Sequence, residues 1–189
     1  NLMLTVKDSA MSNADEDTIY AADVGGGATF SITNSPLLRY GDNFAVSSVL
    51  GALAITVVNS PMTSADSSNF DVSALGSLAI TVTTSQMNAD SNSAAVQDVD
   101  GAVSAIFTTS PMAVNTNDNF YILSIGGNVA LTFTDSSVRS SSYNNFEIDS
   151  AGHVTLALTN SPTWNGQDTF DLTNVGNVAL TLVSSPSTA

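Results

Sequence analysis

Cysteine is absent from the 189-residue sequence, and only three residues are basic. Without cysteine the chain has no disulfide framework, no thiolate metal site and no cysteine nucleophile. The three cations, Lys7, Arg39 and Arg139, stand against 17 acidic residues and leave a net charge of −14. Such a chain cannot neutralise a phosphate backbone or an anionic lipid surface, so we expect no nucleic-acid partner and no binding to anionic membranes.

Long apolar runs are also missing. No run approaches 18 residues, so we expect no membrane insertion. Charged residues make up 11 % of the chain, below the roughly 25 % of ordinary soluble domains. Yet 43 % of the residues are hydrophobic, which is enough to build a core and unlike a disordered chain. The first residue is Asn rather than Met, which predicts a processed or excised chain.

The chain repeats itself about every 25 residues. Nine residues after each of seven anchor glycines stands a serine, and proline follows that serine in five of the seven units. The segment Asn1–Val6 with Ser9 fits the same phase. The anchors are Gly26, Gly51, Gly76, Gly101, Gly127, Gly152 and Gly176.

Within each unit apolar residues alternate with polar ones. The second, fourth and sixth positions after the glycine are apolar, as in Leu53, Ile55 and Val57, and this alternation is typical of a half-buried strand. A second short strand, such as the one containing Phe44 and Val46, precedes each glycine, and we expect the glycine to turn the chain between the two. A polar loop of six to eight residues, for example 63–68, completes the unit.

A unit of this size cannot bury its apolar face alone, whereas stacked units can. We therefore predict an all-β protein: a single β-solenoid (β-helix) domain over residues 1–189, with about seven 25-residue coils, no helices and no capping element. In architecture the pattern resembles extracellular β-solenoid repeat proteins, the stalks of bacterial adhesins and fibre-forming secreted proteins. The resemblance covers the whole chain and implies an extracellular or cell-surface location.

The residue inventory predicts no enzyme. The single histidine, His153, is interpreted as a polar turn residue, and Arg39 and Arg139 are expected in loops of units four coils apart. We expect no catalytic residues, no cofactor and no metal ligands. Calcium between loop aspartates is a less favoured alternative, and Asx-turns before the Phe strands, as at Asp42 and Asp118, are the preferred interpretation.

Two sets of side chains outside the strands could still matter. Tyr40, Tyr143 and Trp164 are expected in the loops after the prolines, where they could touch a surface glycan. The residues that follow the Ser-Pro pairs are apolar and predict a stacked core column. That column contains Leu37, Met62, Met87, Met112 and Val138.

The outward positions of the main strands predict an interaction face. From residue 29 onward they are Ala, Ser, Val or Thr except for Ile106, and none is charged, which suits close contact with a second subunit or with ice. The candidate residues are Thr33, Thr56, Thr81, Thr83, Thr108, Thr132, Thr134, Thr159 and Thr181.

The two ends of the chain suggest a second contact. The sequence begins directly on a main strand and stops just after the last one, so copies could stack end to end into a filament. We expect the contacts at Leu2, Leu4, Val6, Val178, Leu180 and Leu182. The sequence thus favours a secreted structural subunit whose partner is itself. An ice-binding solenoid and a repeat segment of a large adhesin are the alternatives.

Overall fold

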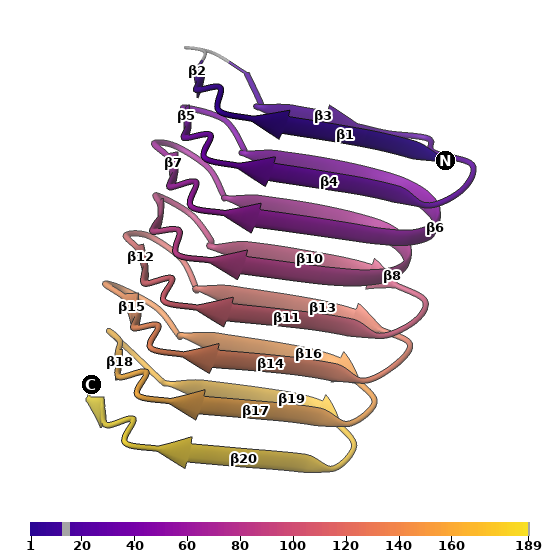
Figure 1. The fold of residues 1–189 in the computed structure, drawn as a ribbon. Helices are drawn as coiled ribbons and strands as arrows, with labels where there is room; N and C mark the ends of the chain where they lie inside the picture. Colours follow the sequence, from indigo (N-terminus) through magenta and orange to yellow (C-terminus); the bar gives the residue numbers. More distant parts are fainter. Residues whose placement is uncertain (13–15, 189) are drawn as a thin grey trace.

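The chain forms a β-solenoid of about seven coils in a computed structural model that describes residues 1–12 and 16–188 (Figure 1). Every paired strand is parallel to its neighbours, and successive coils stack along one axis. The described residues contain no helix, as predicted, and so none that could cross a membrane.

Two of the three faces belong to one 13-stranded sheet that bends at the glycine column. The main face holds β1 (Leu2–Lys7), β4 (Ala28–Thr33), the second part of β6 (Phe44–Val58) and of β8 (Phe70–Thr83), β11 (Val103–Thr108), β14 (Val129–Thr134), β17 (Val154–Thr159) and β20 (Val178–Val183). The second face holds β3 (Ile19–Ala21), the first part of β6 and β8, β10 (Ala94–Val99), β13 (Phe120–Ile125), β16 (Phe146–Ala151) and β19 (Phe170–Val175).

The third face is an eight-stranded sheet of very short strands. It contains β2 (Met11–Ser12), β5 (Leu37–Arg39), β7 (Met62–Ser64), β9 (Met87–Ala89), β12 (Met112–Val114), β15 (Val138–Ser140), β18 (Thr163–Trp164) and β21 (Ser187–Thr188). The expectation that Thr63 and Ser64 belong to a polar loop is wrong, because both lie on β7. Two- and three-residue strands are too short for alternation to show.

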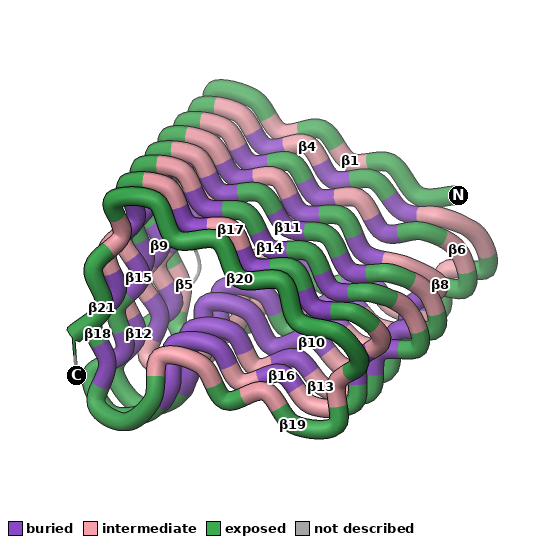
Figure 2. Tube along the Cα trace, turned by 90° about the horizontal axis from the view of Figure 1, so that it is seen from below, coloured by how far each residue is buried: buried purple, intermediate pink, exposed green. Residues whose placement is uncertain are grey.

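The core lies between the three faces (Figure 2). The predicted inward positions are confirmed, since Leu53, Ile55 and Val57 are at most 1 % exposed. The predicted apolar column is confirmed too, and Leu37, Met62, Met87, Met112 and Val138 are all buried. Phenylalanine rings stack from coil to coil inside, for example Phe44 on Phe70 with centroids 5.1 Å apart and Phe146 on Phe170 at 5.4 Å.

The repeated serine joins each coil to the next. The Ser85 hydroxyl donates to the Thr83 carbonyl (2.8 Å) and accepts the backbone N–H of Ser60 (2.9 Å), and Ser85 is fully buried. The same N–H to hydroxyl bond links every serine of the column to the serine of the following coil, from Ser9 to Ser185. This ladder supplies partners for groups that would otherwise be buried unpaired, which accounts for the serine in every unit.

The anchor glycines lie at the bend, but they do not supply its turn conformation. No glycine has a positive φ, whereas Ser48, Ala74 and Ser124, two or three residues earlier, have φ of 54°, 52° and 59°. β6 and β8 run through Gly51 and Gly76. Glycine is required because the coils approach closely here. A Cβ on Gly76 would stand 2.8 Å from the Gly51 carbonyl oxygen, closer than van der Waals contact permits.

The aspartates before the Phe strands bond to the next coil instead of forming the expected Asx-turns. Asp42 Oδ1 accepts the Ser67 hydroxyl (2.5 Å) and the backbone N–H of Ser68 (2.8 Å). Asp118 Oδ1 accepts the backbone N–H of Asn144 (2.7 Å), and Asn144 Oδ1 in turn accepts that of Asp168 (3.0 Å). A parallel stack brings equivalent loop positions together, and these bonds between coils therefore replace bonds within a turn.

Burial makes one aspartate of this ladder sensitive to pH. Burial, together with the nearby carboxyl of Glu147, raises the pKa of Asp118 to about 6. Burial is also the main cause of the raised pKa values of Asp42 and Asp71. Because the folded state holds the Asp118 proton more tightly than the unfolded state does, the stability that this group contributes is fully present at low pH and is lost as the pH rises from about 4 through 6.

Replacing Asp118 by asparagine should therefore stabilise the protein at neutral and alkaline pH. Asparagine keeps the oxygen that accepts the Asn144 N–H, as Asn144 itself does one coil later. We expect Asp118→Asn to raise the free energy of unfolding by roughly 1–2 kcal/mol at pH 8 and hardly to change it at pH 4. Urea unfolding between pH 4 and 8 measures this.

The control for Asp118→Asn removes the same charge from an exposed loop side chain, Asp66. Asp66→Asn should change stability by less than about 0.5 kcal/mol at either pH. An Asp118→Asn effect of equal size at pH 4 and pH 8 would show that the carboxyl is not penalised in the folded state.

Candidate interaction face

The main face presents three outward columns of side chains, because the strands pair in register along the stack. Thr29, Ala54 and Ala79 are consecutive members of the first column, Ser31, Thr56 and Thr81 of the second, and Thr33, Val58 and Thr83 of the third. Neighbouring strands are about 4.8 Å apart, and alternate residues of one strand about 6.6 Å. The result is a regular two-dimensional array of short side chains, and Figure 2 shows the main strands that carry it running side by side along the stack.

All nine threonines predicted for the interaction face point outward on the main strands, and none is buried. Thr56, Thr81, Thr132 and Thr181 belong to the second column, and Thr33, Thr83, Thr108, Thr134 and Thr159 to the third. Paired threonines in one strand occur at Thr81 and Thr83 and again at Thr132 and Thr134. Two apolar members are well exposed, Ile106 at 44 % and Val183 at 49 %.

Charge is nearly absent from the outward columns. Lys7 on β1 is the one charged residue in them, since β1 adds Met3, Thr5 and Lys7 to the array. The acidic residues lie on other parts of the surface, for example Asp71 and Glu147 on the second face and Asp98 and Asp100 at the bend. A surface with a single charge can be dehydrated at low cost away from that residue, which is the property that close contact with another surface requires.

The six residues predicted for end-to-end contacts lie on the first and last main strands of the chain. Val178, Leu180 and Leu182 on β20 are 45–48 % exposed, although Leu156, the neighbour of Leu180 in the preceding coil, is fully buried. Leu2 on β1 is 38 % exposed, and Leu4 and Val6 are partly buried against the core. All six continue the inward columns of the main face.

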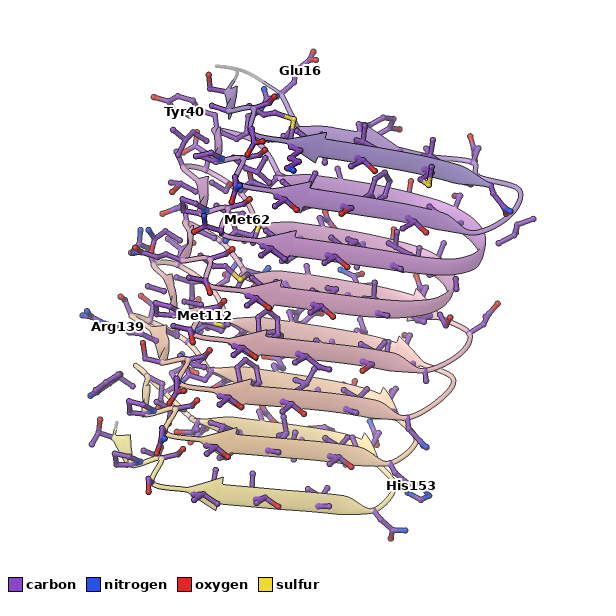
Figure 3. All side chains as sticks on the ribbon, viewed as in Figure 1. Glu16, Tyr40, Met62, Met112, Arg139 and His153 are labelled. Atoms are coloured by element: carbon purple, nitrogen blue, oxygen red, sulfur yellow. The ribbon has the colours of Figure 1, made fainter. Side chains whose placement is uncertain are left out.

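The remaining candidates are spread over different parts of the solenoid. His153 lies at the bend, where its backbone N–H donates to Asn128 Oδ1 (2.9 Å) and its Nδ1 accepts the N–H of Asn177 (3.1 Å), so it links three coils (Figure 3). Arg39 and Arg139 lie on the short strands β5 and β15, and the expectation that they occupy loops is wrong. Within residues 1–12 and 16–188, no three histidine, aspartate or glutamate side chains are close enough to share a metal ion.

One of the three aromatic side chains departs from its expected loop position. Trp164 lies on β18, whereas Tyr40, directly after β5, and Tyr143 are in loops as expected. All three are about half exposed, at 44, 55 and 45 %. Figure 3 shows Tyr40 and Arg139 pointing away from the third face. The sequence does not reveal the hollow beside Trp164, because the strands of the third face are too short to be recognised as a sheet.

Comparison of the chain with protein-family models, curated proteins and solved structures finds no match.

Proposed function

We propose that the chain is a non-enzymatic structural protein, a secreted β-solenoid that associates with further copies of itself into a filament. The nearly uncharged main face is the observation that carries this proposal. The chain has a net charge of −14, but the outward positions on the eight strands of the main face carry only one charge, that of Lys7. Negative charge on the other faces keeps the protein soluble and disfavours contact there, so association is directed to the main face.

The first and last coils support stacking along the axis. Each serine of the ladder donates its backbone N–H to the hydroxyl of the following coil, which leaves the Ser185 N–H facing one end and the Ser9 hydroxyl oxygen facing the other. A second copy placed head to tail would join this donor to this acceptor. It would also cover Val178, Leu180 and Leu182 with Leu2, Leu4 and Val6, as neighbouring coils do inside the protein.

Two variants on adjacent residues of β20 separate the two contacts. Leu180→Lys places a charge in the inward column at the end of the stack, whereas Thr181→Lys places the same charge on the main face. Negative-stain microscopy and sedimentation velocity across protein concentration should show filaments of uniform width for the unchanged chain. We expect short particles for Leu180→Lys, and filaments without lateral bundles for Thr181→Lys.

The control places a charge on a face that already carries charge. Gln97→Glu adds a carboxylate on the second face, and Thr132→Glu adds one in the middle of the main face. Only the second change should reduce bundling. Single rods at every concentration would overturn self-association. The adhesin alternative requires further repeats in the same phase. A chain extended by such repeats that stays a single rod would support an adhesin stalk instead.

The threonine array favours one further candidate, ice binding. Hydroxyl and methyl groups form a flat lattice whose spacings are set by the sheet, and they come in pairs on one strand at Thr81 with Thr83 and at Thr132 with Thr134. A regular array of this kind can match a regular array of water molecules, as antifreeze β-solenoids do. Thermal hysteresis of the single rod that disappears in Thr132→Glu but persists in Gln97→Glu would favour this function over self-association.

A further inference from the structure

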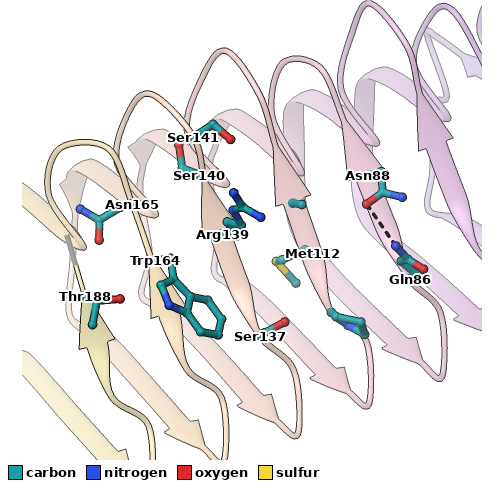
Figure 4. Close-up of a pocket in the computed structure, with 12 residues that line it drawn as sticks. Gln86, Asn88, Met112, Ser137, Arg139, Ser140, Ser141, Trp164, Asn165 and Thr188 are labelled. Atoms are coloured by element: carbon teal, nitrogen blue, oxygen red, sulfur yellow. Dashed lines mark hydrogen bonds between the residues drawn. The ribbon is translucent and has the colours of Figure 1, made fainter.

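A hollow of about 710 Å³ opens on the third face between β9, β12, β15 and β18 (Figure 4). It exists because the outward column of this face runs Asn88, Ala113, Arg139, Trp164 from coil to coil. The methyl group of Ala113 fills little space between the longer side chains on either side. A volume of this size falls within the range of sites that take a small molecule.

The walls of the hollow combine an aromatic ring with neutral polar groups. Trp164 stands at one side with 44 % of its surface exposed, and the buried Met112 contributes apolar surface. On the opposite side Gln86 Nε2 donates to Asn88 Oδ1 at 3.4 Å. Ser137, Ser140, Ser141 and Asn165 add hydroxyl and amide groups to the lining. Such groups can donate and accept hydrogen bonds in many directions.

The charge of the hollow is opposite to that of the rest of the molecule. Arg139 is exposed and lines it, and none of its 12 lining residues is an aspartate or glutamate, although the chain carries 17 acidic residues. Trp164 is the neighbour of Arg139 in the next coil, so a planar cation and a planar ring adjoin on one surface. This pairing points to a ligand that carries both a negative charge and a flat apolar face.

We propose that the hollow binds a short acidic saccharide, one or two sugar units with a carboxylate such as a uronic acid. The guanidinium of Arg139 would take the carboxylate in a forked pair of charge-assisted hydrogen bonds. The indole of Trp164 would cover the apolar face of the sugar ring. Asn88, Asn165 and the serine hydroxyls would bond to the sugar hydroxyls. One cation in a chain of net charge −14 suits a single carboxylate and not a phosphate backbone.

This site is separate from the proposed self-association. The hollow lies on the eight-stranded sheet, and the uncharged columns lie on the main face of the 13-stranded sheet. Lateral contact through the main face leaves the hollow open, and binding can be measured at concentrations where the protein is a single rod.

The single tryptophan of the chain makes binding directly observable. Trp164 fluorescence and its indole N–H signal in NMR both report on this hollow. We expect digalacturonic acid to shift both signals saturably, and the neutral digalactoside to shift them at least tenfold more weakly. Salt should weaken the binding of the acidic sugar, because the pair between its carboxylate and Arg139 is partly exposed.

Two variants test the assigned roles, and one serves as the control. Arg139→Gln should weaken the binding of digalacturonic acid by about tenfold or more. Trp164→Thr introduces threonine, the residue type that Thr63 and Thr188 already provide in the same outward column. It should weaken the binding of digalacturonic acid severalfold, as measured by backbone NMR signals. Lys7→Gln removes the same charge from the main face and should leave the affinity unchanged. Equal binding of both sugars, no binding of either, or an equal loss in Lys7→Gln would overturn the proposal.

Discussion

Phe107→Ala should lower the free energy of unfolding by about 3–5 kcal/mol, one of the two largest losses that we expect from a single substitution. Phe107 is fully buried on β11. Its ring stacks on Phe133 at 5.0 Å and meets Phe120 edge to face at 5.4 Å. Alanine would remove both contacts and leave a cavity in the middle of the stack, where coils on either side prevent collapse.

The local sequence explains why this phenylalanine matters more than others. The second face has Ala94 in the column where neighbouring coils have Phe70 and Phe120. Phe107 brings an aromatic ring into the same coil from the main face, so nothing else large can fill the space.

Urea unfolding followed by circular dichroism measures the loss, with Phe170→Ala as the comparison. Phe170 is only partly buried and stacks on one ring, that of Phe146, so its removal should cost clearly less. A loss below about 1 kcal/mol for Phe107→Ala would mean that the core repacks around the gap. Because each coil contacts only its neighbours, the variant should also broaden the unfolding transition.

Gly127→Ala should cost about 2–3 kcal/mol, although it adds one methyl group near the surface. A Cβ on Gly127 would stand 2.7 Å from both the carbonyl carbon and oxygen of Gly101 and 2.8 Å from the nitrogen of Ala102. All three atoms belong to the backbone of the preceding coil, which can move only by lengthening the bonds between coils. The Gly127 N–H to Gly101 carbonyl bond (3.0 Å) would be the first affected.

Gly25→Ala is the matched control for this substitution. A Cβ on Gly25 would meet nothing within 4 Å, and its φ is not positive. Alanine there should leave stability unchanged or raise it by about 0.4–1 kcal/mol, because the unfolded chain loses freedom. Thermal unfolding of the two variants side by side, with amide exchange at the bend, gives the comparison. Equal melting temperatures would refute the close approach of the coils as the reason for the glycine column.

The main strands and the stack could be predicted from the sequence because their signals are local and repeated. Alternation at Leu53, Ile55 and Val57 predicts which side chains are buried, and the recurrence of that pattern in each unit predicts that units lie on one another. The outward threonines follow from the same alternation, since an in-register parallel sheet carries alternate residues to the opposite face.

The bend and the third face could not be predicted from the sequence, because their causes lie in neighbouring coils. Ser48 and Ala74 adopt a left-handed conformation that neither residue type favours alone. The stack imposes that conformation, since the strands on both sides of the bend must pair with those of the next coil. Strands of three residues such as Val138–Ser140 likewise exist through pairing and not through their own pattern.

By itself, then, the sequence determined the all-β class, the coil length, the inward columns and the nearly uncharged main face, because periodicity in a chain becomes periodicity in a stack. Only the tertiary structure decided why glycine and serine recur, where Asp42 and Asp118 bond, and that Ala113, Arg139 and Trp164 adjoin on one face. Those features depend on distances between residues about 25 positions apart, which the packing of one coil on the next creates.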